Sequence, residues 1–231
     1  MWINWNDLPE NMKNEQVRPY YEKLKQKRGS LITKRLFDIL VSLVMLILLS
    51  WLFLILAIAI KVDSHGPVFY RQVRVTTGNR NFRIFKFRTM VNNADKIGSL
   101  VTTGNDSRIT RVGAKIRKCR LDEIPQLLNI LKGEMSFVGT RPEVRKYVDR
   151  YTDEMMATLL MPAGVTSLAS ISFKDEDELI DEYTEKGMSV DDAYMEKVLP
   201  EKMKYNLEYI NQFGAFRDIK LMIQTFVSVI K

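Results

Sequence analysis

Two adjacent carboxylates, Asp122 and Glu123, are the residues in this sequence best placed to do chemistry. They directly precede an apolar pattern of helical spacing, and arginines lie on both sides of them along the chain. Arg117 comes five residues before Asp122, and Arg141 follows in a second turn. A carboxylate can act as a nucleophile or a base, and guanidinium groups pair well with phosphate oxygens. The set predicts a site for an anionic, phosphorylated substrate.

The element that carries this pair is predicted to be a short helix. Its apolar residues follow the spacing of one helix face, at Ile124, Leu127, Leu128 and Leu131. Pro125 fits only the first turn, so we expect a start between Asp122 and Ile124, with Asp122 as the N-cap and Gly133 as the stop. Capping is the commoner role of such a pair. The arginine of the second turn favours catalysis.

Residues 39–60 form an uncharged run of 22 residues, ILVSLVMLILLSWLFLILAIAI. About 20 apolar residues suffice to span the hydrocarbon core of a bilayer, and a run that is apolar on every face does not fit a buried core helix. The sequence therefore predicts a membrane segment. Asp38 at its entry is costly in lipid unless Lys34 or Arg35, one turn earlier, pairs with it.

Both flanks of this run are basic. Residues 13–35 hold eight Lys/Arg against two acidic residues, and residues 61–88 hold seven against one. Because basic flanks prefer the cytoplasmic side, a helix that enters and turns back would satisfy both. Ser50, in the middle of the run, can bend a helix by bonding a carbonyl one turn back, but the run lacks the proline that usually causes a sharp kink. A simple span stays open as the alternative.

Three further parts of the chain have readable patterns. Residues 68–70 and 81–88 are expected to form a hairpin around Thr77-Gly78-Asn79, and its Lys86 and Arg88 are candidates for binding phosphate. Residues 143–160 are expected to form one amphipathic helix. Residues 198–231 are expected to form a helix pair split near Gly214, which either faces the core or lies in the membrane interface. Residues 1–33 are expected to be a loosely ordered arm or a surface helix.

The composition limits the kinds of partner and metal site that the protein can have. The formal net charge of +7 favours an anionic partner. A single cysteine, Cys119, and a single histidine, His65, exclude an intrachain disulfide and a Cys/His zinc site. Basic residues alternate with aromatic ones between residues 61 and 120, which leaves a nucleic-acid or anionic-lipid binding module as a non-enzymatic alternative. Asp175 and Asp177 fit the Asp-x-Asp metal pattern of some glycosyltransferases, although acidic runs often contain it by chance.

Five motifs in order resemble the bacterial sugar transferases, the monotopic polyprenyl-phosphate phosphoglycosyl transferases. They are KRLFD at 34–38, DSHGPVFYRQ at 63–72, KFRTM at 86–90, LDEIPQ at 121–126 and VGTRP at 138–142. The resemblance covers residues 34 to about 170 and is closest to the small, catalytic-core type. Two positions depart from the family pattern: Ser50-Trp51 stands where the family has Ser-Pro, and Thr140 where it has the first proline of Pro-Arg-Pro.

The resemblance implies the transfer of a phosphosugar from a UDP-sugar to undecaprenyl phosphate, with release of UMP, at the start of glycan, capsule, O-antigen or exopolysaccharide assembly. It implies that Asp122 is the nucleophile and a ligand of Mg²⁺, that Glu123 helps to activate the polyprenyl phosphate, and that Arg117 and Arg141 hold phosphate. Two carboxylates beside a diphosphate need such cations to offset the charge repulsion.

Together these interpretations predict a mainly helical α+β protein. We expect a polar arm at 1–33, a re-entrant or spanning membrane helix at 34–61, and a catalytic domain at 62–231. The domain is expected on the cytoplasmic face of the bacterial inner membrane, with no nucleic-acid partner and with a homodimer as a possible state.

Overall fold

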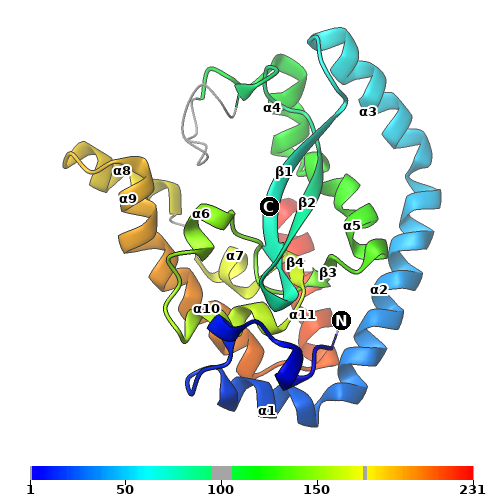
Figure 1. The fold of residues 1–231 in the computed structure, drawn as a ribbon. Coiled ribbons are helices and arrows are strands. Elements are labelled where there is room, and N and C mark those ends of the chain that lie inside the picture. Colours follow the sequence, from blue (N-terminus) through cyan, green and yellow to red (C-terminus); the bar gives the residue numbers. More distant parts are fainter. Residues whose placement is uncertain (1, 95–105, 174–175, 231) are drawn as a thin grey trace.

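A bent pair of helices runs along the right-hand edge of the molecule, and the other elements pack on its inner side (Figure 1). The computed structural model describes residues 2–94, 106–173 and 176–230. The pair consists of α2 (Arg28–Leu48) and α3 (Ser50–Asp63), whose axes meet at 62°. Ser50 Oγ donates to the Ile47 carbonyl at 2.8 Å, so the expected serine-based bend is present without a proline.

The outer side of this pair is apolar and exposed. Its exposed residues include Ile32, Leu36, Leu40, Ile47, Leu48, Trp51 and Leu54. Within the described ranges no single helix is long and apolar enough to cross a membrane. By length and composition alone, the bent pair α2 and α3 together could do so.

A β-hairpin forms the centre of the molecule. β1 (Phe69–Thr76) pairs antiparallel with β2 (Arg80–Phe87), from Phe69 opposite Phe87 to Thr76 opposite Arg80. The turn Thr77–Asn79 needs positive φ at Gly78 (68°), a conformation that glycine adopts without a steric penalty. The predicted hairpin is therefore confirmed, with a first strand longer than expected.

The chain after the hairpin forms helices and then a second small sheet. α4 (Arg111–Lys118) leads through a 3₁₀ segment, Leu121–Gln126, into α5 (Leu127–Lys132). β3 (Met135–Val138) then pairs in parallel with β4 (Ala163–Thr166). These two small sheets among many helices confirm the mainly helical α+β class.

The continuous helix expected over residues 143–160 is wrong. The chain forms a short helix, α6 (Arg145–Val148), and later a 3₁₀ segment, Met155–Leu160. Tyr147 packs in one hydrophobic cluster with Tyr194, whereas Val148 packs in another with residues of the N-terminal segment. Burial in two separate clusters overrides the helical periodicity of the sequence.

In the described residues after β4, the chain is mainly helical. The helices are α7 (Leu168–Ser172), α8 (Glu176–Glu185), α9 (Val190–Ala193), which continues into a π-helical turn (Tyr194–Val198), α10 (Leu199–Asn211) and α11 (Ala215–Ile230). The predicted split near Gly214 is confirmed. α10 buries Met203, Tyr209 and Ile210, whereas α11 exposes Phe216, Ile219, Ile223 and Val227. α10 is thus a core helix, and the outer face of α11 is apolar and uncovered.

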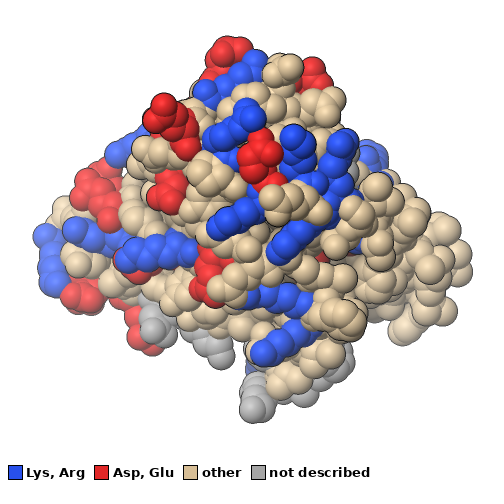
Figure 2. Space-filling view, turned by 90° about the horizontal axis from the view of Figure 1, so that it is seen from below, with Lys and Arg blue, Asp and Glu red and all other residues tan. Residues whose placement is uncertain are grey.

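The N-terminal segment is packed and not a loosely ordered arm. It contains two 3₁₀ turns (Trp5–Asp7 and Glu10–Met12) and a surface helix, α1 (Arg18–Gln26), and it buries Met12, Val17 and Leu24 almost completely. Lys and Arg side chains gather on the face seen from below in Figure 2, beside an uncharged projection at its right-hand edge. Exposed cations of this part of the chain are Arg18, Lys23, Lys25 and Arg28.

Candidate active site

The carboxylate pair lies in the 3₁₀ segment Leu121–Gln126. The residue that starts it is Arg120, in a left-handed conformation with φ 55°, so the expectation that Asp122 is the N-cap is wrong. Pro125 explains the tighter winding, because it lacks the N–H that an α-helix would donate to the Leu121 carbonyl. The stop at Gly133 (φ 81°) is confirmed.

Two cations enclose the carboxylates. Lys86 Nζ lies 2.9 Å from Glu123 Oε1 and 3.9 Å from Asp122 Oδ2, and Arg141 Nη2 lies 3.7 Å from Glu123 Oε1. Asp122 is about nine-tenths buried. Four of the six predicted site residues therefore meet, although they come from β2, the 3₁₀ segment and the turn after β3.

Asn129 fixes Lys86 beside the carboxylates. Its side chain is fully buried, accepts a hydrogen bond from Phe85 N at 2.8 Å and donates to the Arg83 carbonyl at 3.0 Å. It also donates to Glu134 Oε2 at 2.7 Å. Asn129 thus ties α5 directly to β2, one residue from Lys86.

Close packing of two glycines positions the turn that carries Arg141. A Cβ on Gly164 would lie 2.2 Å from the Gly139 nitrogen, so the two backbones could not approach with larger residues. Thr140, the residue that departs from the family pattern, bonds the Thr158 carbonyl with its hydroxyl at 3.2 Å. Within the described chain, the one ionic contact of the Arg141 side chain is with Glu123, which leaves its other donors for a ligand.

Burial and neighbouring charges move the pKa values of the two carboxylates in opposite directions. Burial raises the pKa of Asp122, the Glu123 carboxylate adds to the rise, and Lys86 and Arg117 oppose it. For Glu123, burial also disfavours the charged form, but Lys86 and Arg141 together outweigh it and lower the pKa to about 2. Two adjacent carboxylates with pKa values pushed apart can take two different chemical roles.

The other two predicted cations lie apart from this cluster. Arg117, in the last turn of α4, acts on Asp122 through its charge. Arg88 is buried and donates to the carbonyls of Ser64 (2.7 Å) and His65 (2.9 Å), which holds the turn between α3 and β1. The structure does not bring Arg88 into the carboxylate cluster.

The oxygen ligands present suit Mg²⁺ that arrives with a substrate. No group of three or more His, Cys, Asp or Glu side chains that could hold a metal exists in the described part of the chain. Mg²⁺ in phosphoryl-transfer sites commonly uses one or two carboxylates together with substrate phosphates and water. Asp122, the expected ligand, is a carboxylate of this kind, and Glu123 lies next to it. Asp175 lies outside the described residues, as does the side chain of Asp177, the alternative metal pair.

Sequence reasoning missed three residues at this site. Arg74, Gln126 and Asn129 lie at or beside the pocket that Lys86, Glu123 and Arg141 also line. The period-two alternation of a half-buried strand could have revealed Arg74. Arg74 and Gln72 share the partly buried face of the strand, and Arg71 and Val73 lie on its exposed face. Nothing in the sequence pattern marks Asn129.

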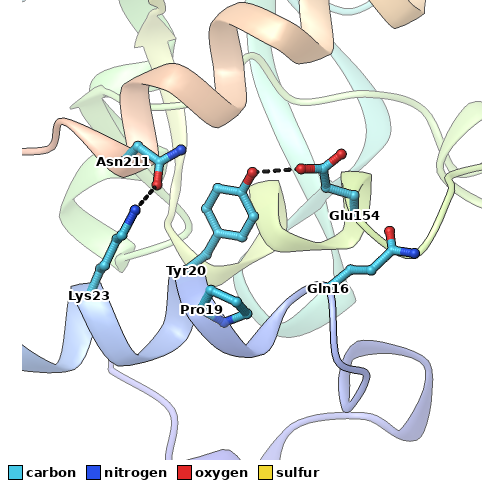
Figure 3. Close-up of a pocket in the computed structure, with 6 residues that line it drawn as sticks. All are labelled: Gln16, Pro19, Tyr20, Lys23, Glu154 and Asn211. Atoms are coloured by element: carbon cyan, nitrogen blue, oxygen red, sulfur yellow. Dashed lines mark hydrogen bonds between the residues drawn. The ribbon is translucent and has the colours of Figure 1, made fainter.

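A larger surface hollow lies elsewhere. Figure 3 shows that Gln16, Pro19, Tyr20, Lys23, Glu154 and Asn211 line it. Its polar groups bond one another, with Tyr20 Oη donating to Glu154 at 2.7 Å and Lys23 Nζ donating to Asn211 at 2.8 Å (Figure 3). It contains none of the predicted site residues.

α2, which belongs to the predicted membrane segment, forms hydrogen bonds with elements on both sides of the site. Arg35 donates to the carbonyls of Ile130 (2.5 Å) and Leu131 (2.7 Å) at the end of α5. Asp38 Oδ1 accepts from Phe137 N in β3 at 3.2 Å. Among the described residues Asp38 forms no direct ion pair with Lys34 or Arg35, because Lys34 pairs with Asp218 at 2.6 Å, but both cations interact with Asp38 through their charge.

Comparison with known proteins identifies the family. The family model described as bacterial sugar transferase matches residues 29–231, and the chain belongs to this family. Over 200 residues the chain is 36% identical to an Aeromonas hydrophila protein named UDP-N-acetylgalactosamine-undecaprenyl-phosphate N-acetylgalactosaminephosphotransferase, covering 85% of this chain and 43% of that protein.

Two further relatives span different lengths. A Klebsiella pneumoniae UDP-glucose:undecaprenyl-phosphate glucose-1-phosphate transferase is 35% identical, over 85% of this chain and 40% of that protein. The exopolysaccharide production protein ExoY of Rhizobium meliloti is 32% identical, over 86% of this chain and 85% of that protein. The chain spans less than half the length of the first two relatives and most of the third.

Proposed function

We propose that the protein transfers a phosphosugar from a UDP-sugar to undecaprenyl phosphate and releases UMP, which begins the assembly of a surface glycan or exopolysaccharide. The observation that carries the proposal is the Asp122–Glu123 pair, set between Lys86 and Arg141 beside a bent apolar helix. The names of the relatives from Aeromonas and Klebsiella, which specify both substrates, support it.

In the first step, a carboxylate oxygen of Asp122 attacks the phosphorus that bears the sugar. The new bond is an acyl phosphate, the bond to the oxygen of the neighbouring phosphate breaks, and UMP leaves with that electron pair. Lys86 and Arg141 lie where they can offset the charge that builds on the phosphate oxygens. Asp122 must be ionised to attack, and Lys86 and Arg117 counter the rise that burial causes in its pKa.

In the second step, a phosphate oxygen of undecaprenyl phosphate attacks the same phosphorus and releases the Asp122 carboxylate. Glu123 stays ionised at neutral pH because its pKa is about 2, and it can accept a hydrogen bond from the incoming phosphate. Splitting one displacement into two through a covalent intermediate is the usual benefit of a nucleophilic side chain. Mg²⁺ bound near Asp122 would neutralise diphosphate charge as a Lewis acid.

The lipid substrate requires a membrane location, and we place the protein on the cytoplasmic face of the inner membrane. The exposed apolar side of α2–α3 and the basic residues that flank it support this location. The bend of 62° fits a helix pair that enters and returns on one side, so that both basic flanks remain cytoplasmic. The exposed apolar face of α11 suits the membrane interface.

A panel of UDP-sugars tests the proposal by UMP release in the presence of undecaprenyl phosphate. We expect UMP from at least one sugar, dependent on the lipid phosphate, and near-complete loss with Asp122→Asn and Glu123→Gln. Release of UDP would favour the metal-dependent glycosyltransferase, and no turnover with any UDP-sugar would favour a binding module. If both variants kept near-normal turnover, the assignment of the carboxylate pair would be wrong.

A further inference from the structure

Arg74 is a third cation in the wall of the site, beyond the residues that the proposed mechanism uses. It lies on β1 and lines the same pocket as Lys86, Glu123, Gln126 and Arg141. Its Nη1 donates to the Pro142 carbonyl at 3.1 Å, directly beside Arg141 in the chain. Arg74 is therefore bonded to the turn that carries Arg141, and both guanidinium groups line the pocket.

The hydrogen bonds of Arg74 go to uncharged acceptors. Its Nε and Nη2 donate to the amide oxygen of Gln72 at 3.1 and 2.7 Å, and Nη1 donates to Pro142 O. These bonds use three of the five N–H donors of a guanidinium. Its planar fork suits the bidentate recognition of a phosphate.

The one carboxylate near Arg74 in the described chain is already held by other groups. Glu143 Oε2 lies 4.0 Å from Arg74 Nη1, at the limit of an ion pair. Glu143 Oε1 accepts a hydrogen bond from Tyr194 Oη at 2.6 Å and lies 3.8 Å from Lys202 Nζ. Burial lowers the pKa of Arg74, Glu143 opposes the fall, and Arg141 adds to it, so the two guanidinium groups lie close enough to repel each other. An anion placed between them would relieve that repulsion.

We propose that Arg74, together with Arg141, binds the α-phosphate of the UDP-sugar, the phosphate that leaves as UMP. This inference rests on the proposed function. Asp122 must reach the sugar-bearing phosphate, and Lys86 is the cation in contact with both carboxylates. Arg74 has no ionic contact with Asp122 or Glu123 within the described chain. We therefore assign it to the α-phosphate, which follows the sugar-bearing phosphate in the diphosphate. A guanidinium there stabilises the charge that UMP gains as the P–O bond breaks.

Titration calorimetry with UMP and with uridine tests the assignment on the detergent-solubilised full chain. Because a charge-assisted hydrogen bond contributes more than a neutral one, we expect Arg74→Gln to weaken UMP binding by about tenfold or more. Uridine binding should not change, and Arg74→Lys should recover part of the affinity by keeping the charge. Arg71→Gln removes the same charge from the exposed face of the same strand and should bind UMP normally.

The outcomes separate this assignment from its alternatives. Equal UMP affinity in Arg74→Gln and the unsubstituted protein would overturn it. A merely structural role through Pro142 would disturb the Arg141 turn, so it would also weaken uridine binding or raise the KM for undecaprenyl phosphate, and either result would overturn the assignment. Failure of the unsubstituted protein to bind UMP at all would instead contradict the proposed function.

Discussion

Replacing Lys34 with methionine would leave Asp218 as an unpaired carboxylate inside the protein. The two side chains meet at 2.6 Å and are only 4% and 8% exposed. Loss of one partner from a buried ion pair costs about 3–5 kcal/mol, because the remaining charge keeps its desolvation penalty. We therefore expect Lys34→Met to lower the free energy of unfolding by that amount and to loosen α11 from α2.

The loss should depend on pH. Burial raises the pKa of Asp218, while Lys34 and the hydroxyl of Tyr209 oppose the rise. Without Lys34 the pKa rises further, so the folded variant binds a proton that the unfolded chain has already lost. Such a group stabilises the fold at low pH, and this contribution disappears as the pH rises through the folded pKa. The destabilisation should be larger at about pH 8 than at about pH 5.

Urea unfolding in detergent, followed by tryptophan fluorescence, measures this effect, because Trp2 and Trp5 pack in the folded N-terminal segment. Lys34→Met with Asp218→Leu should recover most of the lost stability, because a well-packed apolar pair replaces a buried ion pair at little cost. Lys204→Met, which removes an exposed ion pair with Glu201, is the matched control and should cost less than about 1 kcal/mol. An equally small loss for Lys34→Met would refute the reasoning.

Three further predictions concern the site. Lys86 lowers the pKa of Asp122, so in Lys86→Gln the fall of activity on acidification should begin at higher pH, measured as the normalised pH profile of UMP release. EDTA should abolish turnover and added Mg²⁺ restore it, while the unfolding midpoint stays the same, because the described residues offer no cage of three or more metal ligands. Asn129→Ala should cost about 2–3 kcal/mol of unfolding free energy, since it leaves Phe85 N and Arg83 O without a side-chain partner; an unchanged urea midpoint would contradict this.

The turns and helix ends that depend on the preferences of single residues were predictable from the sequence. The hairpin around Gly78, the helix stop at Gly133 and the break between the two C-terminal helices follow from turn and glycine preferences, and all are present. The bend at Ser50 was predictable from its hydroxyl, and it occurs with Trp51 in the position of the family's proline.

The structure differs from the prediction where packing between distant parts of the chain determines the local conformation. The segment 143–160 broke because its apolar residues insert into two clusters, and the N-terminal arm is ordered because Met12 and Val17 find partners in the second half of the chain. At the site, Lys86 and Arg141 were predictable by residue type. Asn129 was not, because its role depends on β2, which lies beside it only in the folded chain. The strand alternation marks Arg74 as half-buried, but it does not show that Arg74 reaches the turn of Arg141.

α2 links the proposed membrane segment to the chemistry through residues only one helical turn apart. Arg35 bonds the last carbonyls of α5, the helix that continues from Asp122 and Glu123. Asp38 bonds the backbone of β3, the strand that leads to Arg141. Because i and i+3 share one helix face, a single face of α2 fixes both the carboxylates and the arginine opposite them. Any tilt of α2 in the bilayer would therefore move both walls of the site together, and the spacing between Glu123 and Arg141 would be preserved.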